Sequence, residues 1–129
     1  MKLRRADVHL LDLSLRTPFT TSFGTATTLR RPFVVLEDAE GRRGVGEAPT
    51  LPDPAYKPEV DTPAVLTSLR EFLLPALVAA HGAGGFDEVG DVRAAMGRIK
   101  GAVFAKSAVE AAWWDLKARY QGVAPVTAR

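Results

Sequence analysis

The sequence predicts an α+β fold in which a three-stranded antiparallel meander is followed by about three helices. Apolar and polar residues alternate near the N-terminus, which is typical of strands, whereas apolar residues recur at helical spacing further on. A proline-rich segment, 48–60, separates the two parts. The 129 residues suit one domain, and contents of 47% hydrophobic and 25% charged residues are typical of a globular chain.

The first strand is predicted from Ala6 to Arg16. Its apolar residues change phase at Leu10 and Leu11, which predicts a β-bulge or a second buried face at that point. The following segment, 17–29, is rich in threonine and breaks the alternation. We therefore expect it to be a connection between strands.

A second strand is predicted over 33–36, where four apolar residues follow one another. It runs into a turn over 38–41, in which Gly41 suits the position with positive φ. A short third strand is expected over 43–47, with Gly44 and Gly46 interpreted as structural turn glycines of this hairpin.

The helical part is predicted to begin with Asp61 or Thr62 as N-cap and a proline in its first turn. Apolar residues at helical spacing run from Val65 to Leu77, and Pro75 is expected to kink this helix or end a segment. A weak helix is expected over 87–96, after a glycine-rich loop.

The last helix is predicted from about Val103 to Tyr120. Neighbouring residues on a helix point about 100° apart, so Trp113 and Trp114 cannot share one face. Two indoles on different faces require cover on more than one side. We expect this small unit to cover one side only, which predicts that a partner surface is missing.

Several classes of protein are excluded or disfavoured by composition. The absence of cysteine excludes disulfide scaffolds, zinc-thiolate sites and thiol nucleophiles. The net charge of +2 gives no support for a nucleic-acid or membrane partner. The longest charge-free apolar stretch, 72–86, is short and is interrupted by Pro75 and glycines, so no membrane span is expected. We therefore expect a cytoplasmic protein.

Motifs that carry chemistry by themselves are missing. There is no HExxH, no phosphate loop and no GxGxxG after a strand. Of the two histidines, His9 is interpreted as a strand-surface residue and His81 as a residue at the C-terminal end of a helix. Glu47, Glu110 and Asp115 lie in apolar surroundings and are candidate acids. No group of residues assembles a nucleophile, a base and an orienting partner, so the residues alone indicate no catalytic centre.

Glu110 and the paired arginines each have a plainer interpretation than a functional site. For Glu110, an i,i+4 ion pair with Lys106 is expected. Three arginine pairs, Arg4-Arg5, Arg30-Arg31 and Arg42-Arg43, are interpreted as a solvated face, with a surface for an anionic partner as the sharper hypothesis.

Aromatic residues in the two connections suggest a function. Phe19 and Phe23 lie in the threonine-rich segment, and Tyr56 lies in the proline-rich one. Apolar side chains on loops suit a lid that excludes water from an apolar or acylated substrate. The alternative is that they fold back onto their own core, and the pattern does not choose between the two.

Four motifs occur in a specific order, and their residues are PFTTSFGT (18–25), GVGEA (44–48), Pro54-Ala55-Tyr56 with Glu59 and Thr62, and AKSAVEAAWWDLKA (105–118) ending in Gly122. This series resembles the N-terminal capping domain of the enolase superfamily, in the mandelate racemase/muconate-lactonizing branch. The first motif is most similar to o-succinylbenzoate synthases that are also N-acylamino acid racemases. The resemblance covers about residues 1–122, and 123–129 form a divergent tail where a barrel would begin.

The resemblance implies an enolase N-terminal domain-like cap packed on a β/α barrel. In that family the barrel has two lysines that move a proton next to a carboxylate, and three acidic ligands hold the magnesium that stabilises the enediolate. None of those residues lies in this chain, where Lys106 belongs to the cap helix motif, so no catalytic or metal-binding residue is expected here. The matching substrate-shell residues are Phe19, Phe23, Thr50, Leu51 and Tyr56.

The sequence departs from the family at Gly101-Ala102-Val103, which replaces the usual Gly-Asn pair, so the start of the last helix is expected to differ. Because the barrel is absent, we expect the chain to be inactive alone, as a truncated gene product or an engineered fragment. Its expected partner is a small-molecule carboxylate that binds through the missing barrel, with magnesium required by the full-length enzyme only. A homo-oligomer is left open, and a nucleic-acid partner is not expected.

The alternative hypothesis is a standalone, non-enzymatic module that binds another protein or dimerises through the exposed face of the last helix. It requires an apolar patch formed by Trp113 or Trp114 together with Leu116 and Tyr120. A surface formed by the paired arginines, which would bind anions or nucleic acid, is the weaker third hypothesis.

Overall fold

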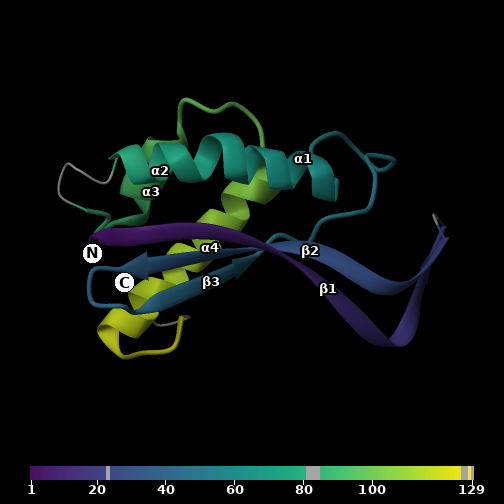
Figure 1. Ribbon diagram of the computed structural model, residues 1–129, viewed down its shortest axis with the longest axis horizontal. Coiled ribbons are helices and arrows are strands. Elements are labelled where there is room, and N and C mark those ends of the chain that lie inside the picture. The colour runs from purple at the N-terminus through teal and green to yellow at the C-terminus, as the bar shows by residue number, and fades with distance from the viewer. Residues whose placement is uncertain (23, 81–84, 126–127, 129) are drawn as a thin grey trace.

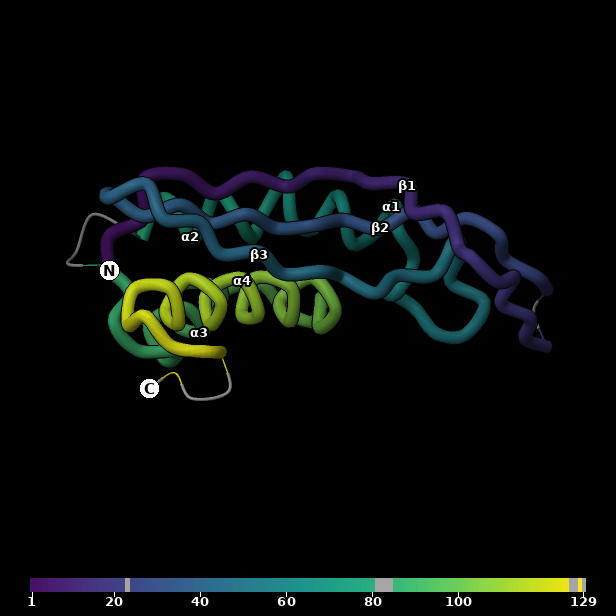
Figure 2. Tube along the Cα trace, turned by 90° about the horizontal axis from the view of Figure 1, so that it is seen from below, coloured from purple at the N-terminus to yellow at the C-terminus, as the bar shows by residue number. Residues whose placement is uncertain are grey.

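The computed structural model describes residues 1–22, 24–80, 85–125 and 128. Its sheet has the strand order β1-β2-β3, and both neighbouring pairs are antiparallel, as predicted. Figures 1 and 2 show the helices packed beside this sheet, while the long β1–β2 hairpin extends beyond them at one end. In chain order the elements are β1 (Leu3–Thr21), β2 (Gly24–Asp38), β3 (Arg43–Glu47), α1 (Thr62–Thr67), the π-helical turn η1 (Ser68–Leu73), α2 (Leu74–Ala80), α3 (Val89–Met96) and α4 (Val103–Gln121).

The predicted bulge at Leu10 and Leu11 is wrong. These residues pair without interruption with Pro32 and Arg31, and the register shifts lie elsewhere, between Leu3 and Arg5 and between Ser14 and Phe19. Leu10 and Leu11 are 40% and 43% exposed. Their change of phase therefore reflects a strand that is partly open to solvent on both faces, and the backbone remains regular.

The prediction of a connection over 17–29 is also wrong, because the two strands continue through this segment. Thr20 pairs with Thr25 across the hairpin, and their hydroxyl oxygens lie 3.0 Å apart. Threonine is β-branched and suits a strand. The alternation is lost here because most side chains on both faces of the hairpin are exposed, so burial imposes no period.

The turn between β2 and β3 has the predicted form. Gly41 has a φ of 85°, and β3 has the predicted bounds. Asp38 holds this turn from its first position, where its Oδ1 accepts the backbone N–H groups of Glu40 and Arg42, both at 2.9 Å. Its Oδ2 accepts Nε of Arg42 at 2.8 Å.

The Asp38 side chain is 3% exposed, and burial raises the pKa of its carboxyl, but the hydrogen bonds from Arg42 and Glu40 outweigh this and hold the pKa below its ordinary value. A lowered pKa in the folded state means stability that is present at neutral pH and is lost as the pH falls towards the folded-state pKa. We expect Asp38→Ala to lower the free energy of unfolding at pH 7 by about 1–3 kcal/mol, because the partly buried donors on Glu40 and Arg42 lose their acceptor. Urea unfolding should show a smaller loss at pH 3 than at pH 7; equal losses would contradict this assignment.

The first helical segment begins as predicted, with Oδ2 of Asp61 accepting N–H of Ala64 at 3.1 Å. Pro75 was expected to kink this helix or end a segment, and a segment boundary does lie just before it, between η1 and α2, although the helical run continues to Ala80. The π-helical η1 widens the turn just before Pro75, and the N–H of Leu74 donates to the carbonyl of Leu69. A proline clashes with the carbonyl four residues earlier, and a π-type turn shifts that carbonyl away.

The helix from Thr62 to Ala80 is long and apolar enough to cross a membrane by length and composition alone. This differs from the expectation that no segment qualifies. A core helix of a globular protein passes the same test, and here Leu69, Leu73 and Leu77 are fully buried.

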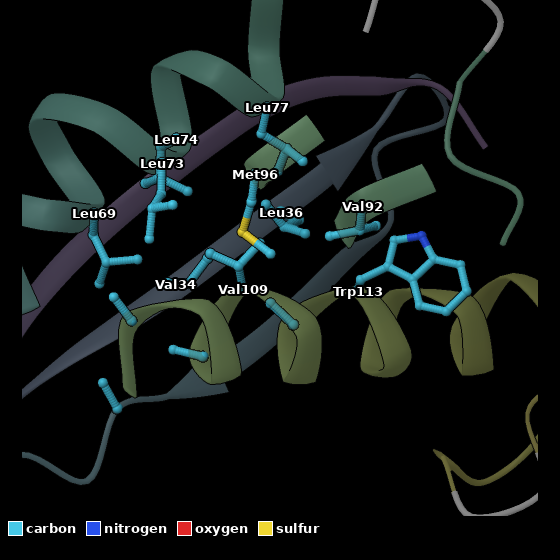
Figure 3. Close-up of a cluster of buried hydrophobic side chains, with 14 of the residues drawn as sticks. Val34, Leu36, Leu69, Leu73, Leu74, Leu77, Val92, Met96, Val109 and Trp113 are labelled. Carbon is cyan, nitrogen blue, oxygen red and sulfur yellow. The ribbon is translucent and has the colours of Figure 1, made fainter. Parts of the chain in front are cut away.

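One hydrophobic core joins the sheet to the helices. Its sheet side is formed by Val34 and Leu36 of β2, which face the leucines of η1 and α2 (Figure 3). Val109 and Trp113 of α4 and Val92 and Met96 of α3 close the same cluster.

Gly44 and Gly46 serve the close approach of β3 to α4, and the prediction that they are turn glycines is wrong. A Cβ on Gly46 would lie 2.0 Å from the carbonyl oxygen of Ala108, and one on Gly44 would lie 2.2 Å from that of Ala112. Only glycine lets the two backbones pack this closely. The side chain of Asp115 covers the outer edge of β3 by accepting N–H of Val45 at 2.8 Å.

Helix α4 is covered on two sides, as its two tryptophans predict, but the unit itself provides the cover. The sheet lies on one side, and the indole Nε1 of Trp113 donates to the carbonyl of Phe86 at 3.1 Å on another. Trp113 is 1% exposed and Leu116 is fully buried, while Trp114 is half-buried edge-on against Trp113. The expectation that this unit covers one side only is therefore wrong.

Candidate functional site

Two segments that carry exposed aromatic side chains lie at one end of the molecule. They are the tip of the β1–β2 hairpin and the proline-rich loop between β3 and α1, and both views place them away from the N-terminus (Figures 1 and 2). The sequence places these segments far apart in the chain. The sheet brings them together because the hairpin extends towards the end where β3 finishes and the loop begins.

Phe19 points away from the core. It pairs with Ala26 next to a register shift in β1 and is 61% exposed. Phe23 lies outside the described residues. Tyr56 is 67% exposed, so among the described aromatic residues of the two segments neither folds back onto the core.

The base of the proline-rich loop is closed by hydrogen bonds. Thr50 is 4% exposed, and its hydroxyl lies 2.7 Å from that of Thr62. The N–H of Leu51 donates to Val60, and the N–H of Thr62 donates to the carbonyl of Leu51 at 2.8 Å. Because the Thr62 hydroxyl also donates to the carbonyl of Arg30 at 3.1 Å, the base is tied to β2.

The second half of this loop, at Lys57 and Glu59, contacts the first turn of α4. The ammonium of Lys57 lies 5.7 Å from the centre of the Phe104 ring, and the N–H of Ala102 donates to Oε2 of Glu59 at 3.3 Å. Leu51, at the base of the loop, is 37% exposed. The result is a closed loop that presents Tyr56 and Leu51 outward, in the manner of a compact surface loop.

The candidate substrate-shell residues therefore divide into three groups. Phe19, Leu51 and Tyr56 are exposed on these two segments, Thr50 is buried in the hydrogen bonds of the loop base, and Phe23 is not described. The sequence did not assign a role to Lys57 or to the carboxylate of Glu59. The signal in the sequence that pointed to Glu59 was its place in the motif with Tyr56 and Thr62.

The paired arginines are all matched by carboxylates among the described residues. Arg4 and Arg43 both contact Glu37, Arg42 contacts Asp38 and Arg31 contacts Glu47. Arg30 pairs with Asp12 and Arg5 pairs with Asp7. This leaves no row of free guanidinium groups to bind an anion.

Glu110 forms its ion pair with Arg93 of α3, with Oε2 accepting Nε at 3.1 Å. Its expected pair with Lys106 is wrong, because the Lys106 ammonium turns back to donate to the carbonyl of Ile99. A tertiary contact with a neighbouring helix has displaced the local i,i+4 pair. Within the described ranges, no three histidine, aspartate or glutamate side chains gather to hold a metal ion.

Comparison with known proteins places this arrangement in a family. The model for the mandelate racemase/muconate lactonizing enzyme N-terminal domain matches residues 5–127. An o-succinylbenzoate synthase from Bacillus subtilis is 29% identical over 125 residues, which are 95% of this chain and 32% of the relative. An N-succinylamino acid racemase from Amycolatopsis is 32% identical over 124 residues, which are 92% of this chain and 31% of the relative.

Solved structures show the same fold. A probable mandelate racemase from Alicyclobacillus acidocaldarius aligns with a TM-score of 0.83 and 28% identity, over 93% of this chain and 32% of that chain. A member of the enolase superfamily from Enterococcus faecalis aligns with a TM-score of 0.78 and 27% identity, over 94% of this chain and 31% of that chain. The chain thus spans about a third of the length of the proteins it matches.

Proposed function

This chain belongs to the mandelate racemase/muconate lactonizing enzyme family, and we propose that it caps the active site of an enzyme of that family. It is the N-terminal domain of an enzyme like the o-succinylbenzoate synthases and N-succinylamino acid racemases. The observation that carries the proposal is the shared position of the β1–β2 hairpin and the proline-rich loop, with Phe19 and Tyr56 exposed on them. Domain bounds of about 1–122, with 123–129 as the start of a divergent segment, are part of the proposal.

The cap acts by excluding water and selecting the substrate. Phe19, Leu51 and Tyr56 present apolar surface that closes over the part of a carboxylate substrate furthest from the reacting carbon, with Phe23 as a fourth contact. Thr50 contributes by holding the loop base, since its hydroxyl is engaged with Thr62. The barrel then removes the proton next to the carboxylate, for dehydration or racemisation, and this chain alone is inactive.

Magnesium is assigned to the barrel of the full-length enzyme. The described residues of this chain do not offer a set of acidic or histidine ligands, so no step is derived through the metal here. The partner is a small-molecule carboxylate in the cytoplasm, and no nucleic-acid or membrane partner is included.

The test joins this chain to the barrel of the Amycolatopsis racemase in place of that enzyme's own N-terminal domain. We expect no turnover of an N-succinylamino acid by the chain alone, and measurable racemisation by the chimera. Phe19→Ala and Tyr56→Ala in the chimera should each lower kcat/KM by about tenfold, mainly through KM, because each removes roughly 1–3 kcal/mol of apolar contact. Tyr120→Phe, a change at a tyrosine on α4, is the matched control.

A folded chimera without turnover, or full activity in both alanine variants, would contradict the proposal. Turnover by the chain alone, above a mock preparation, would contradict its expected inactivity. The alternative of a protein-binding module required an apolar patch of Trp113 or Trp114 with Leu116 and Tyr120, and this patch does not form as expected because Trp113 and Leu116 are buried. A different face of α4 remains exposed, and the same chimera tests a module that would use it. That face has a shallow groove of about 590 Å³ beside Trp114 and Val103, and a module of this kind would not support turnover.

A further inference from the structure

The proline-rich loop meets α4 at a point where the backbone is strained on both sides of the contact. Among the described residues, Glu59 and Ala102 are the two non-glycine residues with positive φ, at 66° and 52°. They are joined by the hydrogen bond from the N–H of Ala102 to Oε2 of Glu59. Strained conformations of this kind persist where the surrounding structure holds them, and they concentrate at functional sites.

Helix α4 needs this contact because it has no N-cap of its own. The N-cap position is Ala102, which lacks a side-chain acceptor, and no side-chain cap hydrogen bond is formed from within the helix. Glu59 places an acceptor and a carboxylate at the positive end of the helix from a distant segment. The preceding residue, Gly101, leaves the room for it, since a Cβ there would lie 2.6 Å from Oε2 of Glu59.

The contact lies three residues after Tyr56. The base of the loop is held independently, by Thr50, Leu51 and Thr62. In the second half of the loop, the described contacts with α4 are the Glu59 carboxylate and the Lys57 ammonium over the ring of Phe104. The Glu59 contact therefore holds the loop on the C-terminal side of Tyr56, while on the other side Oδ1 of Asp53 accepts N–H of Ala55 at 3.0 Å.

We propose that Glu59 is a positioning residue for the substrate-covering loop: by capping α4 it presets the conformation in which Tyr56 faces outward over the substrate. This rests on the proposed function for its role in catalysis, while the contact itself stands on the geometry. A preset loop loses less conformational freedom when the substrate binds. The loss of Glu59 therefore weakens substrate binding more than it slows the chemical step.

The chain has two tyrosines, Tyr56 and Tyr120, which makes the loop directly observable by ¹⁹F NMR after incorporation of 3-fluorotyrosine. Tyr120→Phe assigns the two resonances. We expect Glu59→Ala to move the Tyr56 resonance by more than its linewidth and to leave the Tyr120 resonance in place. Cleavage by chymotrypsin after Tyr56 should become about tenfold faster, the effect of losing a hydrogen bond to a charged group on local opening.

Glu59→Gln keeps an acceptor oxygen and should retain the wild-type Tyr56 resonance. Glu71→Ala, which removes an exposed glutamate on η1 away from this contact, is the matched control and should change neither readout. The proposal is overturned if Glu59→Ala leaves the Tyr56 resonance unchanged, if both tyrosine resonances move together, or if Glu59→Gln behaves like Glu59→Ala. No barrel or substrate is needed, so this result is independent of turnover in the chimera.

Discussion

Replacing Gly46 with alanine should leave the chain without a stable fold. The added Cβ would lie 2.0 Å from the carbonyl oxygen of Ala108 and 2.6 Å from the N–H nitrogen of Ala112, and both neighbours are backbone atoms that cannot rotate away. The strand and helix would have to separate, opening the core around Val34 and Val109. We expect a loss of about 3 kcal/mol or more, a large part of the stability of a domain of this size.

Urea unfolding followed by circular dichroism measures this loss. Gly90→Ala in α3 is the matched control, because a Cβ there meets nothing within 4 Å and alanine favours a helix by roughly 0.5–1 kcal/mol. A Gly46→Ala variant that unfolds at the wild-type urea concentration would show that β3 and α4 do not pack this closely.

The second large effect is expected at Trp113. Its side chain is 1% exposed, and its Nε1 donates to the carbonyl of Phe86, so it holds the segment before α3 against α4. Trp113→Ala should lower the free energy of unfolding by about 3–5 kcal/mol through the cavity and the lost hydrogen bond.

Trp113→Phe should cost less than the alanine variant, because it keeps much of the ring volume and loses the indole N–H. Trp114→Ala is the comparison that separates burial from residue type, since Trp114 is only half-buried. The assignment predicts a clearly smaller loss at Trp114, measured by thermal and urea unfolding. Equal losses at the two positions would contradict it.

Local chemistry in the sequence was sufficient for several elements. The turn glycine Gly41 and the bounds of β3 depend on a few neighbouring residues and were predicted correctly, and the N-cap was narrowed to Asp61 or Thr62, of which the structure uses Asp61. The prediction of α4 likewise rests on residues at helical spacing within the helix itself and needs no distant contact. The ordered motifs identified the family, which the match over residues 5–127 bears out.

The candidate site was predictable only in part. The motifs pointed to the two segments that carry Phe19 and Tyr56, but the pattern did not decide whether those side chains face outward. The distal part of the hairpin, 17–29, was missed because its strands have little burial to impose an alternation.

What the sequence alone determined about this protein is its strand and helix order, its local caps and turns, and its family. The tertiary structure decided the rest: Glu110 pairs with Arg93, β3 approaches α4 through Gly46, and Glu59 caps a helix that begins more than forty residues later. The physical reason is that caps, turns and periodicity are set by interactions within a few residues. Close approach, ion pairing and loop anchoring depend on which distant segments the packed core brings together.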